Sequence, residues 1–269
     1  MKNKLFIYFM TIAFISLIFS QNVKGIAAEN TLKPIKNLTT CENYVNEKNK
    51  VIYLTFDDGP SDNVTNKVLD ILKENNIKAT FFLIGNQIDG LENVVKRIHK
   101  EGHSIGLHTY SHKIKKVYSS RTSFINEMLQ CREKVNEVAG VSPNIIRFPG
   151  GSYKRLSETF LTKLHSYNFK VYDWNMVTSD GLKPKVSPDR LYREATKDSK
   201  ELSTIVLLLH CDYMHKNTCT ALPRIIKYYK DEGYDFKTIT QDTPELYFSI
   251  TKKSFSLFDF LFPSTDCNE

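Results

Sequence analysis

The amino-acid sequence predicts an α/β fold, a distorted (β/α) barrel with about seven parallel strands. Two observations predict it. Short apolar runs alternate with segments of helical periodicity from about residue 51 to residue 240, which is typical of a parallel sheet covered by helices. The strand segments are apolar on both faces, as expected of strands buried on both sides. An open doubly wound sheet shares this pattern, and the placement of polar residues separates the two possibilities.

The first expected strand is the apolar run Val51-Ile52-Tyr53-Leu54, and a helix follows because Val64, Val68 and Leu72 recur at helical spacing. The same reasoning gives the remaining elements. Strands are expected at 51–56, 79–84, 104–108, 144–148, 169–174, 204–209 and near 235–240. Helices are expected at about 62–75, 90–101, 120–139, 157–166, 188–200 and 219–232.

The barrel is favoured because the unusual polar residues fall at or just past the carboxyl ends of different strands. In a barrel these ends converge on one rim, where active sites lie, whereas in an open sheet they would be spread along an edge. The residues are Asp57, Asp58, His108, Arg147, Asp173, Trp174 and His210.

Composition and charge narrow the class of partner. The chain has 269 residues, 41% of them hydrophobic and 25% charged, which is ordinary for a globular protein with a sizeable core. The net charge of +7 favours an anionic partner: a cell-wall polymer, a membrane surface or a nucleic acid. The basic residues form no long block and accompany no nucleic-acid motif, so nucleic acid ranks last.

The N-terminus has the pattern of a secretory signal. A short basic segment precedes an apolar run from Leu5 to Ser20, and small residues follow at Gly25, Ala27 and Ala28. An uncleaved membrane anchor is the alternative, and either predicts an exported protein.

The sequence divides into a signal peptide or anchor (1–28), a polar linker (29–48), the barrel domain (49–248) and a C-terminal tail (249–269) with an apolar run at 255–262. The five cysteines are scattered; Cys211 and Cys219 are close enough in sequence to bridge a loop.

The stretch Thr55-Phe56-Asp57-Asp58-Gly59-Pro60 places two adjacent carboxylates where the first strand ends. A turn can direct both acids to one site, where a metal ion or an arginine must offset their repulsion. The alternative is an ordinary polar strand end in which one acid caps the next helix.

The sequence His108-Thr109-Tyr110-Ser111-His112 places two imidazoles four residues apart at another strand end. Two histidines and one carboxylate are a common ligand set for a divalent metal with an open position. The alternative is a pair of ordinary surface or core histidines.

Arg147 and His210 also end strands. Arg147 can pair with one of the two acids, and the glycines at 150 and 151 let backbone approach a ligand; alone, it would be interpreted as a surface arginine beside a turn. His210 suits an acid or base, with a hydrogen-bonded buried histidine as the alternative. Trp174 can wall a sugar site or simply pack.

Together these stretches resemble polysaccharide deacetylases of the NodB-homology type (carbohydrate esterase family 4), over about residues 49–245. The matching motifs are Thr55-Phe56-Asp57-Asp58-Gly59, His108-Thr109-Tyr110-Ser111-His112, Arg147-Phe148-Pro149-Gly150-Gly151-Ser152, Asp173-Trp174-Asn175 and Leu208-Leu209-His210, in the family's order. The resemblance implies a distorted barrel with fewer than eight strands.

By position, the resemblance implies that Asp58, His108 and His112 ligate a divalent metal, zinc in the first place and cobalt as an alternative. It implies that Asp57 is the general base, that Arg147 pairs with Asp57 and that His210 is the general acid. Substrate contacts are expected from Gly150, Trp174 and Leu208.

Two positions depart from the family pattern. Gly150 stands where a tyrosine is frequent, and Val177 stands where many members have the aspartate that orients the acid histidine. Asp180 is then the nearest carboxylate, so the tuning of His210 is in question.

The expected function is removal of N-acetyl groups from a cell-wall aminosugar polymer, with peptidoglycan N-acetylglucosamine as the first substrate. Chitooligosaccharides, exopolysaccharides, and a catalytically weakened wall-binding domain are the alternatives. The expected protein is a monomer, secreted or held at the outer face of the membrane or wall, with possible attachment through the N-terminal segment and no nucleic-acid partner.

Overall fold

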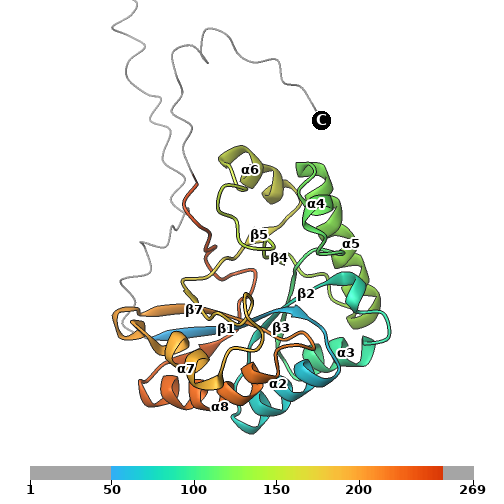
Figure 1. Cartoon of the computed structure of the whole chain (residues 1–269). Helices are drawn as coiled ribbons and strands as arrows, with labels where there is room; N and C mark the ends of the chain where they lie inside the picture. Colours follow the sequence, from blue (N-terminus) through green and yellow to red (C-terminus); the bar gives the residue numbers. More distant parts are fainter. Residues whose placement is uncertain (1–49, 251–269) are drawn as a thin grey trace, which may run out of the picture. The chain divides into compact units, whose positions relative to one another are not determined.

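The computed structural model describes residues 50–250, which form a curled parallel sheet with helices on its outer face (Figure 1). The expected signal segment, the linker and the apolar run at 255–262 lie outside the described residues, and the domain boundaries stay predictions. The strands are β1 (Val51–Gly59), β2 (Thr80–Leu83), β3 (Ser104–Leu107), β4 (Ile145–Ile146), β5 (Lys170–Val171), β6 (Met176–Val177), β7 (Thr204–His210) and β8 (Asp235–Lys237).

The order of the strands identifies a barrel with one gap. Neighbours run β5-β4-β3-β2-β1-β7-β6, and every pairing is parallel. Strands β1 to β5 follow their order in the chain, β7 and β8 both pair with β1, as in a barrel, and the circle is broken between β5 and β6. The predicted fold class is confirmed.

Strand β1 is the centre of the sheet because three strands pair with it. β7 pairs with it from Val51 to Asp57. On its other side, β8 pairs with the first residues, Val51 to Tyr53, and β2 pairs with the last, from Thr55 to Gly59. The end of β1 is thus held on both sides.

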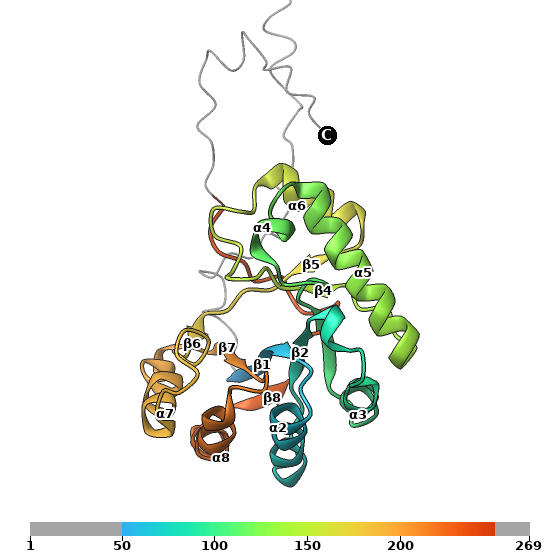
Figure 2. The ribbon, with the colours of Figure 1, turned by 45° about the vertical axis from the view of Figure 1, so that its right-hand side comes forward.

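The helices cover the outer face of the sheet. Figure 2 shows α7 (Pro188–Thr196), α8 (Lys216–Asp231), α2 (Asn63–Glu74) and α3 (Glu92–Lys100) side by side along the strands, followed by α5 (Arg121–Ala139). The short helix α4 (Ile114–Val117) and α6 (Glu158–Ser166) lie near β4 and β5 (Figure 2).

Alternation along β1 determines which side chains enter the barrel. Ile52, Leu54 and Phe56 join the large core between sheet and helices, and the residues between them face the other way. The inward side of β1 therefore carries Tyr53, Thr55 and Asp57. Their register partners on β7 are Val206, Leu208 and His210, respectively. Alternation and register together place Asp57 and His210 opposite each other on the inner face.

Several elements differ from the sequence-based expectation. Strand β6 was not predicted, because two residues inside a polar loop carry no periodicity. The short helix α4 was missed for the same reason, and the helix expected at 188–200 ends at Thr196, after which Asp198 adopts a left-handed φ of 57°. The expected strand 144–148 is paired only at Ile145 and Ile146.

The suggested Cys211–Cys219 bridge is wrong. Both thiols are free. Cys211 is buried with its sulfur against Gly59, whereas the Cys219 thiol lies 3.7 Å from the carbonyl oxygen of Val64. The two side chains point to different neighbours, so no bridge can form. Among residues 50–250, no helix is long and apolar enough to cross a membrane.

Phe148, which follows β4, is fully buried in an aromatic cluster with Phe124, whose ring centroid lies 4.2 Å away, and with Phe160 at 6.1 Å. We expect Phe148→Ala to lower the free energy of unfolding by about 3–5 kcal/mol, because it leaves a cavity that the surrounding helices cannot fill. Urea denaturation measures the loss. As a control, Tyr153→Ala removes a ring that is 58% exposed and should cost less than about 0.5 kcal/mol. Equal losses in the two variants would contradict this prediction.

Candidate active site

A cavity of ≈ 630 Å³ opens at the carboxyl ends of the strands and collects the residues that the sequence singles out. Its walls include Asp57, Asp58, His108, His112, Gly150, Trp174, Val177, Thr178, Ser179, Gly181, Leu182, Glu194, Leu208 and His210. The convergence expected of a barrel rim is therefore present.

The two adjacent acids face one cavity because the end of β1 is irregular. Its register with β2 shifts between Asp57 and Gly59, and Asp58 adopts a φ of 64°. This left-handed conformation is uncommon for a residue other than glycine and breaks the alternation of side chains. Neither acid caps helix α2, whose N-cap is Asp62. The capping alternative is thus wrong.

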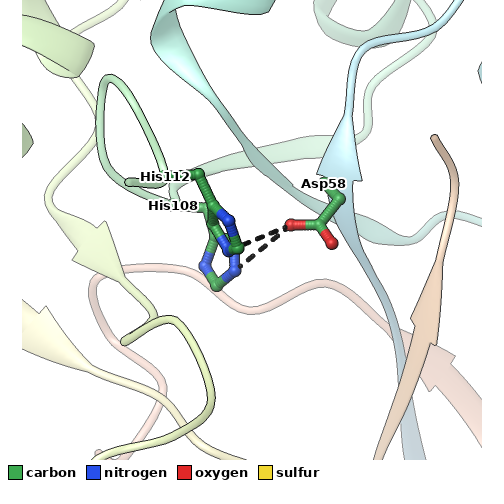
Figure 3. Close-up of side chains that lie close together, drawn as sticks. All are labelled: Asp58, His108 and His112. Carbon is green, nitrogen blue, oxygen red and sulfur yellow. Dashed lines mark ion pairs between the residues drawn. The ribbon is translucent and has the colours of Figure 1, made fainter. Parts of the chain in front are cut away.

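Asp58, His108 and His112 meet in the cavity. Asp58 Oδ1 lies 3.5 Å from His108 Nε2 and 3.4 Å from His112 Nε2. Figure 3 shows the carboxylate of Asp58 aimed at the two imidazoles, which approach it from the loop after β3. The three ligand atoms lie within 4.8 Å of one another.

The protonation of these groups fits a bound cation. His108 Nδ1 lies 3.0 Å from the carbonyl oxygen of Arg147 and must donate to it, which leaves Nε2 with a lone pair directed at Asp58. Burial lowers the pKa of His108, although Asp57 and Asp58 oppose this, so its neutral form is favoured. Asp58 Oδ1 is buried and accepts no hydrogen bond from the described residues. A buried carboxylate oxygen facing imidazole lone pairs suits a divalent metal.

The loop that carries the histidines is held from α5. Glu127, which is buried, accepts hydrogen bonds from the Ser111 backbone N–H at 2.7 Å and from its hydroxyl at 3.0 Å. Thr109 and His112 have φ values of 70° and 51°. Such conformations persist only when the surroundings fix them, and they gather at functional sites.

Arg147 is fully buried inside the barrel and pairs with Asp57. Its Nη1 donates to Asp57 Oδ1 at 2.8 Å and to Thr55 Oγ1 at 2.7 Å. Its remaining nitrogens donate to the carbonyl oxygens of Tyr172 and Asp173 at 2.7 and 2.9 Å. The surface-arginine alternative is therefore wrong.

His210 forms an ion pair with Asp180. The imidazole Nδ1 lies 2.9 Å from Asp180 Oδ1, and the His210 backbone N–H donates to Asp180 Oδ2 at 2.9 Å. Burial opposes a charged imidazole, but the hydrogen bond and charge of Asp180 outweigh it and raise the pKa of His210 to about 9. The same pairing lowers the pKa of Asp180. His210 is thus protonated at neutral pH.

The question raised by Val177 is settled by this contact. Val177 is half exposed on the cavity wall, and Asp180, three residues further on, partners His210. Thr178, Thr218 and the Gly181 backbone N–H also donate to the Asp180 carboxylate. The sequence indicates Asp180 only as the carboxylate nearest to position 177.

The predicted substrate-contact residues all line the cavity. Trp174 also packs edge-on against Phe248, with ring centroids 5.2 Å apart. Gly150 has a φ of 72°, which explains why a glycine stands there. Asp173 does not face the cavity; its carboxylate accepts from Ser152 and from the Phe248 N–H, and therefore supports the wall.

The cavity thus offers three kinds of group. Asp58 and the two histidines can hold a metal. Asp57 keeps one oxygen on Arg147, and its Oδ2 lies 3.8 Å from His108 Nε2, beside the metal position. His210 supplies a proton donor from the neighbouring strand β7. This combination suits metal-assisted hydrolysis.

Comparisons with known proteins agree with this geometry. The profile of the polysaccharide deacetylase family matches residues 44–172. A peptidoglycan-N-acetylglucosamine deacetylase of Bacillus cereus is 33% identical over 226 residues, which are 83% of this chain and 81% of the relative. The putative polysaccharide deacetylase YheN of Bacillus subtilis is 33% identical over 218 residues, which are 78% of this chain and 72% of the relative.

Solved structures show the same fold. The crystal structure of a polysaccharide deacetylase from Bacillus cereus superposes with a TM-score of 0.65 at 33% identity, covering 75% of this chain and 96% of the other. The catalytic domain of a peptidoglycan N-acetylglucosamine deacetylase from Eubacterium rectale gives a TM-score of 0.69 at 28% identity, covering 77% and 96%.

Replacing Asp180 by asparagine removes the charge that holds the proton on His210. We expect the pKa of His210 to fall from about 9 by about one to three units in Asp180→Asn, so that a larger share of the imidazole is neutral near pH 7. NMR titration of the His210 ring measures the change. Asp62→Asn, at the exposed N-cap of α2, is the control and should leave the pKa of His210 unchanged. An unchanged pKa in Asp180→Asn would mean that another group charges His210.

Gly181 lies directly against the His210 ring. A Cβ at this position would lie 2.7 Å from Nε2 and 2.9 Å from Nδ1. We therefore expect Gly181→Ala to push the imidazole away from Asp180 and to lower the pKa of His210 in the same titration. Leu182→Ala is the control, because that side chain is 87% exposed. If the pKa of His210 is the same in both variants, the added methyl group does not displace the imidazole, and the prediction is wrong.

Proposed function

This chain belongs to the polysaccharide deacetylase family of hydrolases, and from that premise we propose that it removes N-acetyl groups from a cell-wall aminosugar polymer, with peptidoglycan N-acetylglucosamine as its substrate. One observation carries the proposal. The buried Asp58 oxygen that lacks a hydrogen-bond donor lies between two imidazoles, in a cavity that also holds an arginine-paired carboxylate and a protonated histidine. Metal-assisted hydrolysis of an amide uses a metal site, a base for the water and an acid for the leaving amine.

We assign Asp58, His108 and His112 as metal ligands. Zinc suits two imidazoles and one carboxylate, and cobalt is the alternative. When bound, a divalent metal polarises the amide carbonyl and acidifies water to a pKa of roughly 7. The protein's own part is to keep both Nε2 atoms unprotonated, which the bond from His108 Nδ1 to the Arg147 carbonyl does for His108.

Asp57 is the proposed general base. Arg147 donates to its Oδ1 at 2.8 Å and fixes the orientation of the carboxylate, which leaves Oδ2 to take a proton from the attacking water. A backbone N–H near Gly150 can donate to the oxyanion that forms on the carbonyl carbon.

His210 is the proposed general acid. An amine leaves poorly unless it is protonated, and His210 carries a proton at neutral pH because Asp180 raises its pKa to about 9. Loss of that proton at alkaline pH should reduce the rate. Trp174 and Leu208 form apolar walls for the sugar ring.

The proposed setting is the cell wall. The relatives' names include peptidoglycan-N-acetylglucosamine deacetylases of Bacillus cereus and Listeria monocytogenes. The N-terminal pattern predicts export, and the positive net charge suits an anionic wall polymer. Export, attachment to the membrane and a monomeric state remain predictions.

The direct experiment measures acetate released from peptidoglycan by the purified protein with added zinc or cobalt. We expect release that a chelator abolishes and added metal restores, and a rise in melting temperature on adding zinc. Asp57→Asn should lower the rate by about 10²–10⁴-fold while keeping the zinc-induced shift in melting temperature, because it removes the base but no metal ligand.

His112→Ala should lose both the activity and the shift. Asp242→Asn, at an exposed position, is the control and should retain both. Metal binding without acetate release from peptidoglycan or chitooligosaccharides would exclude this function for those substrates.

A further inference from the structure

The structure has a second hollow, and its lining residues are neighbours in the chain of residues that line the active-site cavity. It has a volume of ≈ 560 Å³, and its lining consists of Lys183, Pro184, Lys185, Tyr213, Met214 and Lys216. We call these six residues the basic groove. Its walls continue those of the cavity along the chain: Gly181 and Leu182 line the cavity and Lys183 begins the groove, while Tyr213 follows His210 by three residues.

The walls of the basic groove are fixed to the scaffold that positions His210. Asn217 in α8 donates to the Val186 carbonyl at 2.8 Å, and the Lys183 backbone N–H donates to the Ser179 carbonyl at 2.9 Å. On the other wall, Asp212 accepts from the Met214 backbone N–H at 2.7 Å. Hydrogen bonds to α8 and within the loops therefore hold both walls of the basic groove in place.

Exposed apolar side chains gather here. Of the seven large apolar side chains that are exposed among residues 50–250, four lie on the cavity wall or in the basic groove. They are Val177, Leu182, Tyr213 and Met214, and Tyr213 is 70% exposed. A gathering of exposed apolar side chains at an active-site cavity and a nearby hollow favours a binding surface, and a tyrosine face suits a sugar ring.

The charge of the groove is positive and uncompensated. Within the described part of the chain, the ammonium groups of Lys183, Lys185 and Lys216 form no ion pair or hydrogen bond. The nearby carboxylate of Asp212 is already engaged by His215, whose Nδ1 lies 2.7 Å from it. Three unpaired ammonium groups favour an anionic ligand, and the exposed tyrosine ring in the same groove favours a ligand that contains a ring.

We propose that the basic groove binds a carboxylate-bearing sugar next to the N-acetylated sugar that occupies the active-site cavity. The sugar ring packs on Tyr213, and its carboxylate lies among the three lysines. This inference rests on the proposed function and narrows the substrate to glycans in which a neighbouring unit is anionic, such as N-acetylmuramic acid whose lactyl carboxylate carries no stem peptide, in preference to uncharged chitin chains.

The test compares two tetrasaccharides of equal length. One alternates N-acetylglucosamine with N-acetylmuramic acid whose lactyl carboxylates are free, and the other is neutral chitotetraose. We expect the metal-loaded wild type to have the higher kcat/KM for the anionic tetrasaccharide, and this advantage to shrink when salt is raised, because screening weakens exposed charges.

A triple variant, Lys183→Gln with Lys185→Gln and Lys216→Gln, should reduce the anionic-to-neutral ratio of kcat/KM about tenfold, mainly through KM. The matched control replaces Lys73, Lys96 and Lys100 by glutamine; these lysines are exposed on α2 and α3 and line neither hollow, so the ratio should stay in place. Tyr213→Ala should weaken both substrates to a similar degree, because the ring packs on sugar regardless of charge.

The outcomes separate this inference from the proposed function. Suppose that both tetrasaccharides release acetate and that the triple variant has the same anionic-to-neutral ratio of kcat/KM as the wild type. That result would overturn the proposed role of the basic groove and leave the proposed deacetylase function standing. No acetate from either tetrasaccharide or from peptidoglycan, with metal bound, would overturn the proposed function itself. A wild-type preference for chitotetraose would also overturn the inference.

Discussion

The buried ion pair between Arg147 and Asp57 is the interaction on which the site depends. A guanidinium with no exposed surface is costly unless its charge and donors are satisfied, and here Asp57, Thr55 and two backbone carbonyls satisfy them. These contacts join β1, the residue after β4, and the segment that follows β5. The same arginine thus holds the inside of the barrel together and orients one oxygen of the proposed base.

The two adjacent acids differ because their partners differ. Asp57 follows the alternation of β1, so its side chain points into the barrel and pairs with Arg147. Asp58 has a left-handed backbone conformation, so its side chain points toward His108 and His112, and its Oδ1 accepts no hydrogen bond from the described residues. The irregular backbone at Asp58 therefore gives the two acids different roles. The charge of the Asp57 carboxylate is paired with Arg147, whereas the Asp58 carboxylate can bind a cation. Arg147 offsets the charge of Asp57, and a bound cation would offset that of Asp58.

The opposite side of the cavity depends on the loop between β6 and α7. Asp180 in this loop charges His210, Gly181 leaves room for its imidazole, and Lys183 begins the basic groove. Because Thr218 and Asn217 of α8 hold this loop by hydrogen bonds, the proposed proton donor and the proposed sugar site share one support. A change in this loop would therefore affect both the proton transfer and the choice of substrate.

The sequence by itself determined the alternation of strands and helices, and it identified Asp57, Asp58, His108, His112 and Arg147, because hydrophobic period and strand ends are local patterns. It named Asp180 only as the nearest carboxylate for His210, without establishing their contact, and it did not yield β6 or the basic groove. These features depend on which loops, far apart in the sequence, lie close together in the fold. The spacing of residues along the chain does not reveal how close two such loops are in space. The doubt attached to Val177 arose in this way: only the folded loop brings Asp180 to within 2.9 Å of the imidazole. Local polarity selects the chemically able residues, and the long-range pairing of parallel strands decides which of them meet.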